Sequence, residues 1–133
     1  MAKSILCAID FSESSVNALK WAAEFSSRFK CHLTVLYPYR LLATTKEDVI
    51  KVKKENEEIA IRKFTSLETD YLNGKVMSFD FSAEVGFLAD RIEDHLRKNS
   101  ILILVIGKHM NSSSQENLDD LINKVKVPVV VVP

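Results

Sequence analysis

Glycine is scarce in this chain, which has 133 residues and only three glycines. An average protein has a glycine share of roughly 7 %. Loops that wrap a phosphate use glycine because their backbone must approach the ligand closely or adopt a positive φ. The shortage therefore argues against a glycine-rich phosphate loop.

Other absences narrow the class of protein further. Two cysteines, Cys7 and Cys31, argue against a fold that depends on disulfides. The 18 basic and 18 acidic residues balance, so there is no basic excess for nucleic acid. The apolar run near the N-terminus is too short for a signal peptide or a membrane span. We expect a cytoplasmic protein that binds neither nucleic acid nor membrane.

Residue types that carry catalysis or bind metals are present but poorly arranged. The three histidines, His32, His95 and His109, stand at spacings that common metal sites do not use. No G-x-S-x-G turn presents a serine nucleophile, and no serine, histidine and aspartate follow a recognisable order. We therefore expect no metal site and no enzymatic activity.

The period of the apolar residues changes along the chain, which predicts alternating strands and helices. We expect strands at 5–9, 33–37, 75–82, 101–106 and 129–132, and helices at 12–29, 46–72, 85–96 and 115–125. Pro38 should end the second strand, because proline cannot donate to a sheet ladder. The alternation predicts one α/β domain over residues 1–133, with a parallel sheet covered by helices on both faces.

Asp10 directly follows the first strand, where ligands bind in sheets of this kind. Its carboxylate and the hydroxyls that follow it, beginning with Ser12, could hold a ribose or another polar group. The same residues are also the preferred caps of a helix N-terminus and need no ligand. From this segment alone, capping is the favoured interpretation.

A second polar segment follows the most apolar strand and begins at Gly107. Lys108 and His109 could meet an anion, and three serines offer hydroxyls ahead of a helix N-terminus: Ser112, Ser113 and Ser114. The alternative is a polar loop with a capping box between Ser113 and Glu116. Acidic residues in the first turns of that helix oppose a phosphate, which favours the alternative.

The last predicted strand consists of four valines, Val129, Val130, Val131 and Val132. At the edge of a sheet, such a strand presents unpaired backbone groups that can pair with another chain. We expect a homodimer built through this strand. The alternative is an internal strand covered by a helix.

These segments together resemble the universal stress protein family over the whole chain. The most specific parts are the opening strand and turn, ILCAIDFSES at 5–14, and the closing segment VPVVVV at 127–132. The resemblance implies a Rossmann-like fold of the adenine nucleotide alpha hydrolase-like type, with strand order 3-2-1-4-5. It also implies a dimer formed through the last strand.

Some members of that family bind ATP through the motif G-x2-G-x9-G-[S/T] after the fourth strand. In this chain the first glycine is Gly107, but the next three positions hold Met110, Asp120 and Leu121. The acidic residue after strand one is kept as Asp10. The backbone position that contacts adenine falls on or beside Pro38, which has no N–H. The resemblance therefore implies a degenerate ATP-binding motif.

From these observations we expect a non-catalytic stress-response protein that acts through dimerisation and contact with an unknown protein partner. We expect no cofactor, because the usual glycine loop for ATP is lost or weak. The alternative is a nucleotide- or anion-binding switch that uses Asp10 and the loop from Gly107 to Ser114 in an atypical mode.

Overall fold

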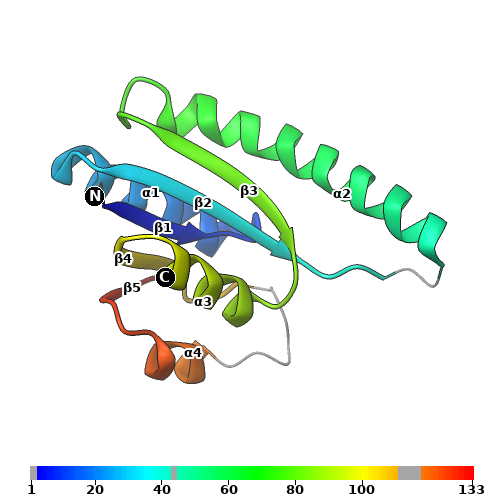
Figure 1. Ribbon diagram of the computed structural model, residues 1–133. Helices are drawn as coiled ribbons and strands as arrows, with labels where there is room; N and C mark the ends of the chain where they lie inside the picture. Colours follow the sequence, from blue (N-terminus) through cyan, green and yellow to red (C-terminus); the bar gives the residue numbers. More distant parts are fainter. Residues whose placement is uncertain (1–2, 43–44, 111–117) are drawn as a thin grey trace.

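Five parallel strands form one sheet in the computed structural model, which describes residues 3–42, 45–110 and 118–133 (Figure 1). The strand order β3-β2-β1-β4-β5 confirms the predicted order. The strands are β1 (Ser4–Ala8), β2 (His32–Tyr39), β3 (Phe79–Val85), β4 (Ile101–Gly107) and β5 (Val129–Val132). The helices are α1 (Glu13–Phe29), α2 (Lys46–Leu67), the π-helical turn η1 (Glu68–Leu72), α3 (Leu88–Lys98) and α4 (Leu118–Lys124).

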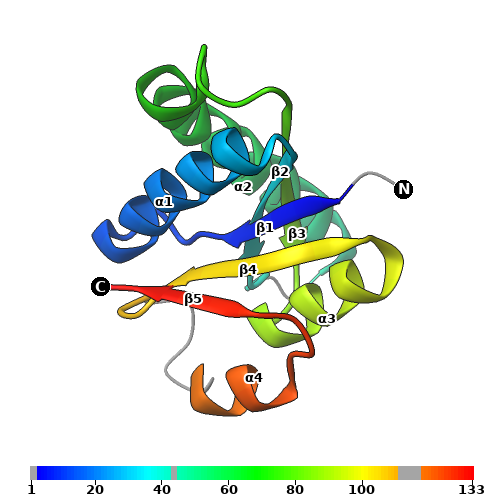
Figure 2. The ribbon, with the colours of Figure 1, turned by 90° about the vertical axis from the view of Figure 1, so that its left-hand side faces the viewer.

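Helices cover both faces of the sheet, as the alternation predicts (Figure 2). Successive residues of a strand point to opposite faces. Ile5 and Cys7 of β1 accordingly belong to a core shared with α1, α2 and η1. Leu6 and Ala8 belong to a second core shared with α3 and α4. The central strands are therefore apolar on both sides, as expected of buried parallel strands.

The third strand differs from the prediction at both of its ends. It begins at Phe79 and not at residue 75, because the N–H groups of Lys75 and Val76 donate to the Leu72 carbonyl and continue the turn after η1. It ends at Val85, which the apolar pattern had assigned to the following helix. Gly86 then turns the chain at a φ of 141°, and α3 begins at Leu88.

The second strand runs through Pro38 to Tyr39, so the prediction that Pro38 ends it is wrong. The Leu36 carbonyl accepts from Ile9, so alternate residues of β2 direct their backbone groups toward β1. Pro38 has the same orientation, but β1 has ended at that level. The missing N–H therefore removes no bond from the ladder.

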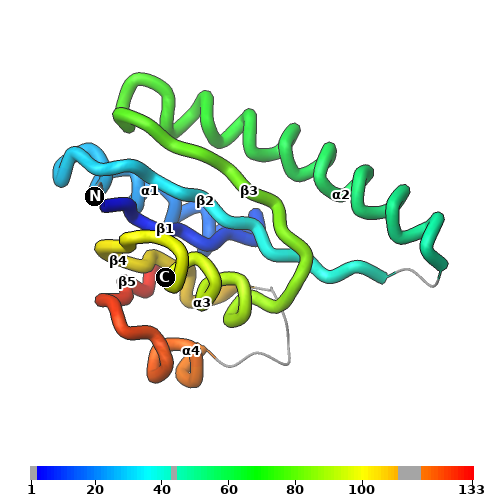
Figure 3. Tube along the Cα trace, in the orientation of Figure 1, coloured from blue at the N-terminus to red at the C-terminus, as the bar shows by residue number. Residues whose placement is uncertain are grey.

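The predicted helix over residues 46–72 is observed as α2 followed by η1, and it extends well past the strands it covers (Figure 3). Only Ala60 and Phe64 of α2 are buried. Gly74 has a φ of 78° just after η1, the left-handed conformation expected of it. The predicted start of the last helix at residue 115 lies outside the described residues, and α4 is described from Leu118.

Candidate functional site

Three of the predicted site residues come together at the carboxyl ends of the strands. Asp10 follows β1, Pro38 stands near the end of β2, and Gly107 ends β4, and these three strands are neighbours. Lys108 and His109 follow Gly107 and are exposed. Ser112, Ser113 and Ser114 lie outside the described residues, as does the predicted capping box of Ser113 with Glu116.

The turn around Asp10 is held by its own hydrogen bonds. An Asp10 carboxylate oxygen accepts from the Ser12 N–H at 3.0 Å and also from the Ser12 hydroxyl. The Ser12 hydroxyl oxygen in turn accepts from the Ser15 N–H at 3.3 Å and caps α1. Between Asp10 and Ser12, Phe11 adopts a left-handed φ of 63°, which is uncommon for a bulky residue. The carboxylate of Asp10 therefore stabilises the start of α1, which agrees with the capping interpretation.

Ser14 connects the beginning of α1 to β5 and to the segment after β4. Its hydroxyl accepts from the His109 N–H at 2.9 Å and donates to the Val132 carbonyl at 3.3 Å. The same carbonyl accepts from the Lys108 N–H at 2.7 Å. This network ties the first residues after β4 directly to the end of β5.

Gly107 lacks a side chain because Ser14 occupies the space beside it. A Cβ at Gly107 would lie 2.5 Å from the Ser14 hydroxyl oxygen and 2.7 Å from the Ser14 carbonyl carbon. Real Cβ atoms essentially never approach another heavy atom this closely. The side of Gly107 that would carry a Cβ therefore packs against α1, and this packing explains the glycine.

Two of the three positions that depart from the ATP motif belong to the core. Leu121 on α4 is buried, and Met110 packs against the same core cluster on the face covered by α3 and α4. Asp120 lies on the exposed side of α4. Met110 and Leu121 therefore contribute to the core between α4 and the sheet in this chain.

Aromatic side chains gather beside the Asp10 turn, on the face covered by α1 and α2. The ring of Phe11 lies 4.9 Å from that of Tyr37, which stacks on Tyr39 at 5.8 Å. Burial and the nearby Asp10 carboxylate raise the pKa of Tyr37. Burial, together with the carboxylate of Glu57, raises the pKa of Tyr39 to about 12. Both phenols are therefore neutral at physiological pH.

The structure brings a serine, a histidine and an aspartate together where the sequence order did not suggest it. His32 Nδ1 lies 2.8 Å from the Ser78 hydroxyl, and Nε2 lies 2.6 Å from an Asp80 carboxylate oxygen. Catalytic triads keep the carboxylate buried, whereas the Asp80 side chain is 56 % exposed. We interpret this group as a polar contact between β2 and β3 on the solvent-facing side of the sheet.

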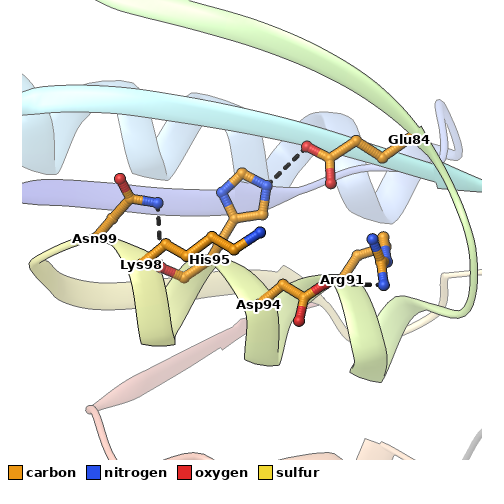
Figure 4. Close-up of a pocket in the computed structure, with 6 residues that line it drawn as sticks. All are labelled: Glu84, Arg91, Asp94, His95, Lys98 and Asn99. Atoms are coloured by element: carbon orange, nitrogen blue, oxygen red, sulfur yellow. Dashed lines mark hydrogen bonds and ion pairs between the residues drawn. The ribbon is translucent and has the colours of Figure 1, made fainter.

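A second polar group, which sequence reasoning also missed, joins β3 to α3 (Figure 4). Glu84 faces His95 at 2.8 Å and accepts from the Ser82 hydroxyl at 2.6 Å. Arg91 pairs with Asp94 at 2.8 Å beside it. A cavity of about 170 Å³ is lined by the four charged or imidazole side chains of this group, together with Lys98 and Asn99: Glu84, Arg91, Asp94 and His95. Acidic and basic groups balance here, so the site favours neither an anion nor a cation.

The predicted dimer strand, β5, lies at the edge of the sheet next to β4. The carbonyls of Pro128 and Val132 accept from β4 and from Lys108, so the backbone groups of Val129 and Val131 face the free edge. Val131 is 39 % exposed. This arrangement contradicts the alternative of an internal strand.

Metal ligands and membrane-spanning helices are considered only for the part of the chain that the structure describes. Within it, no group of three or more histidine, cysteine, aspartate or glutamate side chains could hold a metal ion. Within it, too, no helix has the length and apolar character to cross a membrane.

Many solved structures have the same fold, and three of them show the range of sequence identity and TM-score. Universal stress protein UspA from Lactobacillus plantarum has 16 % identity and a TM-score of 0.82, over 99 % of this chain and 98 % of its own. A universal stress protein family member from Burkholderia pseudomallei has 20 % identity and a TM-score of 0.77, over 99 % and 96 %. The universal stress protein from Archaeoglobus fulgidus in complex with dAMP has 21 % identity and a TM-score of 0.66, over 100 % and 98 %.

Sequence comparison gives the family assignment. A search of curated proteins finds no significant match. The family model described as "Universal stress protein family", however, matches residues 1–133. Together with the parallel sheet and its strand order, this match shows that the chain belongs to the universal stress protein family.

Proposed function

We propose that this chain is a non-catalytic universal stress protein that acts in the cytoplasm through dimerisation and contact with another protein. In this proposal the chain needs no cofactor, and ATP binding by the usual glycine loop is lost or weak. The observation that carries the nucleotide part of the proposal is that Ser14 occupies the space beside Gly107, so packing explains the one remaining motif glycine without a phosphate.

Three further observations support the nucleotide part of the proposal. Leu121 and Met110 are committed to the core, so they cannot leave it to form a phosphate loop without exposing apolar surface. Asp10 holds Ser12 and the start of α1. Pro38 directs no N–H toward the carboxyl end of β1, where a backbone donor would meet an adenine edge.

A nucleotide- or anion-binding switch is the second candidate. In its favour, His109 lines a cavity of about 390 Å³ at the start of α1, together with Ser12 and Ser14. The similar protein from Archaeoglobus fulgidus forms a complex with dAMP. Against it, Glu13 lines the same cavity and places a negative charge beside any phosphate.

Isothermal titration with Mg-ATP separates the two candidates. We expect no binding in the micromolar range, and purified protein should show the ratio of absorbance at 260 and 280 nm of a nucleotide-free protein. Micromolar binding that is lost in Lys108→Ala or His109→Ala would overturn the proposal and establish the switch. Micromolar binding that survives both changes would also overturn it and would place the nucleotide elsewhere.

Sedimentation velocity tests the dimer, with Val131→Pro as the variant. Proline removes the N–H that Val131 directs to the free edge, and edge strands tolerate proline. Val131→Thr keeps this N–H and is the matched control. We expect a dimer for the wild type and for Val131→Thr, and a monomer for Val131→Pro. A wild type that remains monomeric at high concentration contradicts the proposal.

A further inference from the structure

Three aromatic side chains form a stripe along α1, which we call the α1 stripe: Trp21, Phe25 and Phe29. Their rings follow one another at 5.8 Å and 6.2 Å. Residues four apart lie on the same side of a helix, so the three form one continuous surface. Trp21 and Phe29 are each 53 % exposed, whereas Phe25 is partly buried against the core. Exposed apolar side chains that are gathered in one place often mark an interface.

The contacts on either side of α1 show which way this stripe faces. On one side, Lys20 lies 4.8 Å from the Tyr71 ring in η1, and Glu24 pairs with Lys75 at 2.7 Å. On the other side, Asn17 donates to the Pro133 carbonyl at 3.3 Å, just beyond β5. Trp21 follows Asn17 by one turn of helix. The α1 stripe therefore begins on the side of α1 that borders β5, away from α2.

The level of Trp21 along the sheet follows from the contact between Ser14 and Val132. α1 runs antiparallel to the strands, because it returns the chain from β1 to the parallel strand β2. Seven helical residues rise about 10.5 Å, the length of about three strand residues. Trp21 therefore stands level with about Val129, at the first part of β5.

We propose that the partner covering the α1 stripe is a second copy of this chain, and that Trp21 of both copies fills the space above two paired β5 strands. This inference rests on the proposed dimer and adds a second contact to it. A two-fold axis between the β5 strands makes one sheet of two, with both α1 helices on the same face.

Simple spacing shows why aromatic side chains suit this position. α1 lies over β1 and β4, and neighbouring strands are about 4.8 Å apart. The two α1 axes would then be separated by four strand spacings, about 19 Å. Helices in direct contact are about 8–10 Å apart. The remaining space of about 10 Å needs large side chains from both helices, and Trp21 is the large side chain that α1 carries at the level of β5.

The α1 stripe also supplies area that β5 lacks. β5 has only four residues, and only Val129 and Val131 direct backbone groups to the free edge. Stable interfaces bury about 1,200–2,000 Å² in total, and a pair of such short strands contributes little of this. Tryptophan gives the largest contact area of any side chain and commonly dominates interface energies.

The test uses Trp21 as both the reporter and the site of change, since it is the only tryptophan in the chain. As the wild-type concentration rises through the dimerisation range, we expect tryptophan emission to shift to shorter wavelength and acrylamide quenching to fall. We expect Trp21→Ser to raise the dimer dissociation constant at least tenfold by sedimentation equilibrium. Ile50→Ser is the matched control on α2, where Ile50 is 71 % exposed, and it should leave the constant unchanged.

The outcomes separate this inference from the proposed dimer. A wild-type dimer whose tryptophan emission and quenching do not change on dimerisation overturns the role of the α1 stripe and leaves the β5 dimer standing. An unchanged dissociation constant for Trp21→Ser does the same, and indicates that a different protein covers the stripe. A wild type that is monomeric at every concentration overturns both proposals. The emission measurement needs no variant, so a poorly folded Trp21→Ser protein does not prevent the test.

Discussion

Replacing Gly107 with alanine tests whether packing against α1 explains this glycine. The new Cβ would lie 2.5 Å from the Ser14 hydroxyl oxygen, 2.7 Å from its carbonyl carbon and 2.8 Å from its carbonyl oxygen. Rotation of the Ser14 side chain relieves only the first contact. The other two atoms belong to the backbone of α1, so the helix or β4 must shift.

The expected cost can be placed within the known range for overpacked sites. Forcing an extra methyl group into a packed core costs about 1–3 kcal/mol. We expect about 2–3 kcal/mol for Gly107→Ala, because most of the close contacts involve backbone atoms. For a domain of this length that cost lowers Tm by about 6–15 °C.

Urea unfolding followed by circular dichroism measures the loss, and two further variants interpret it. Gly74→Ala is the control, since its Cβ would meet nothing within 4 Å and only the φ of 78° opposes it, at about 1–2 kcal/mol. In the double variant, adding Ser14→Ala should restore little of the free energy of unfolding that Gly107→Ala loses. If Gly107→Ala unfolds within 0.5 kcal/mol of the wild type, where about 2 kcal/mol is expected, the packing explanation is wrong.

Three further predictions concern buried polar groups. Ser14→Ala should lower the free energy of unfolding in urea by about 1–2 kcal/mol, because the His109 N–H loses its acceptor; an unchanged value would contradict the network. Cys7 is fully buried and its thiol pKa is raised, so a thiol reagent at pH 8 should modify it only on unfolding, and rapid native labelling would refute this. The raised pKa of Tyr39, about 12, predicts that stability falls as the pH rises from about 10 to 12. Tyr39→Phe should reduce that fall, and an equal fall in the variant would contradict the assignment.

The sheet could be predicted from the sequence because two of its strands are uninterrupted runs of apolar residues. Residues 101–106 and 129–132 read as strands on composition alone, and the structure places both where expected. The ends of strands were less predictable where a tertiary contact overrides a local sequence preference. Pro38 lies inside a strand because β1 ends beside it, and Val85 pairs with Tyr39 in the sheet although its spacing also suits a helix.

The candidate site was predictable only in part, because its main contact joins distant residues. Asp10 and Gly107 could be placed at one edge of the sheet from the order of the strands. That Ser14 occupies the space beside Gly107 depends on how α1 lies over β4, which no local pattern encodes. Similarly, Leu121 reads as a lost motif position in the sequence, and only the packing of α4 reveals it as a core residue.

The helix α2 is longer than the strands beneath it, so part of this helix lies outside the cooperatively folding core. With 22 residues, α2 spans about 33 Å, whereas the seven residues of β3 span about 23 Å. No residue of α2 before Ala60 is buried. Amide protons in its first turns can therefore exchange through local fraying, without global unfolding. Evolution can lengthen or shorten this end by whole turns while the core keeps its packing.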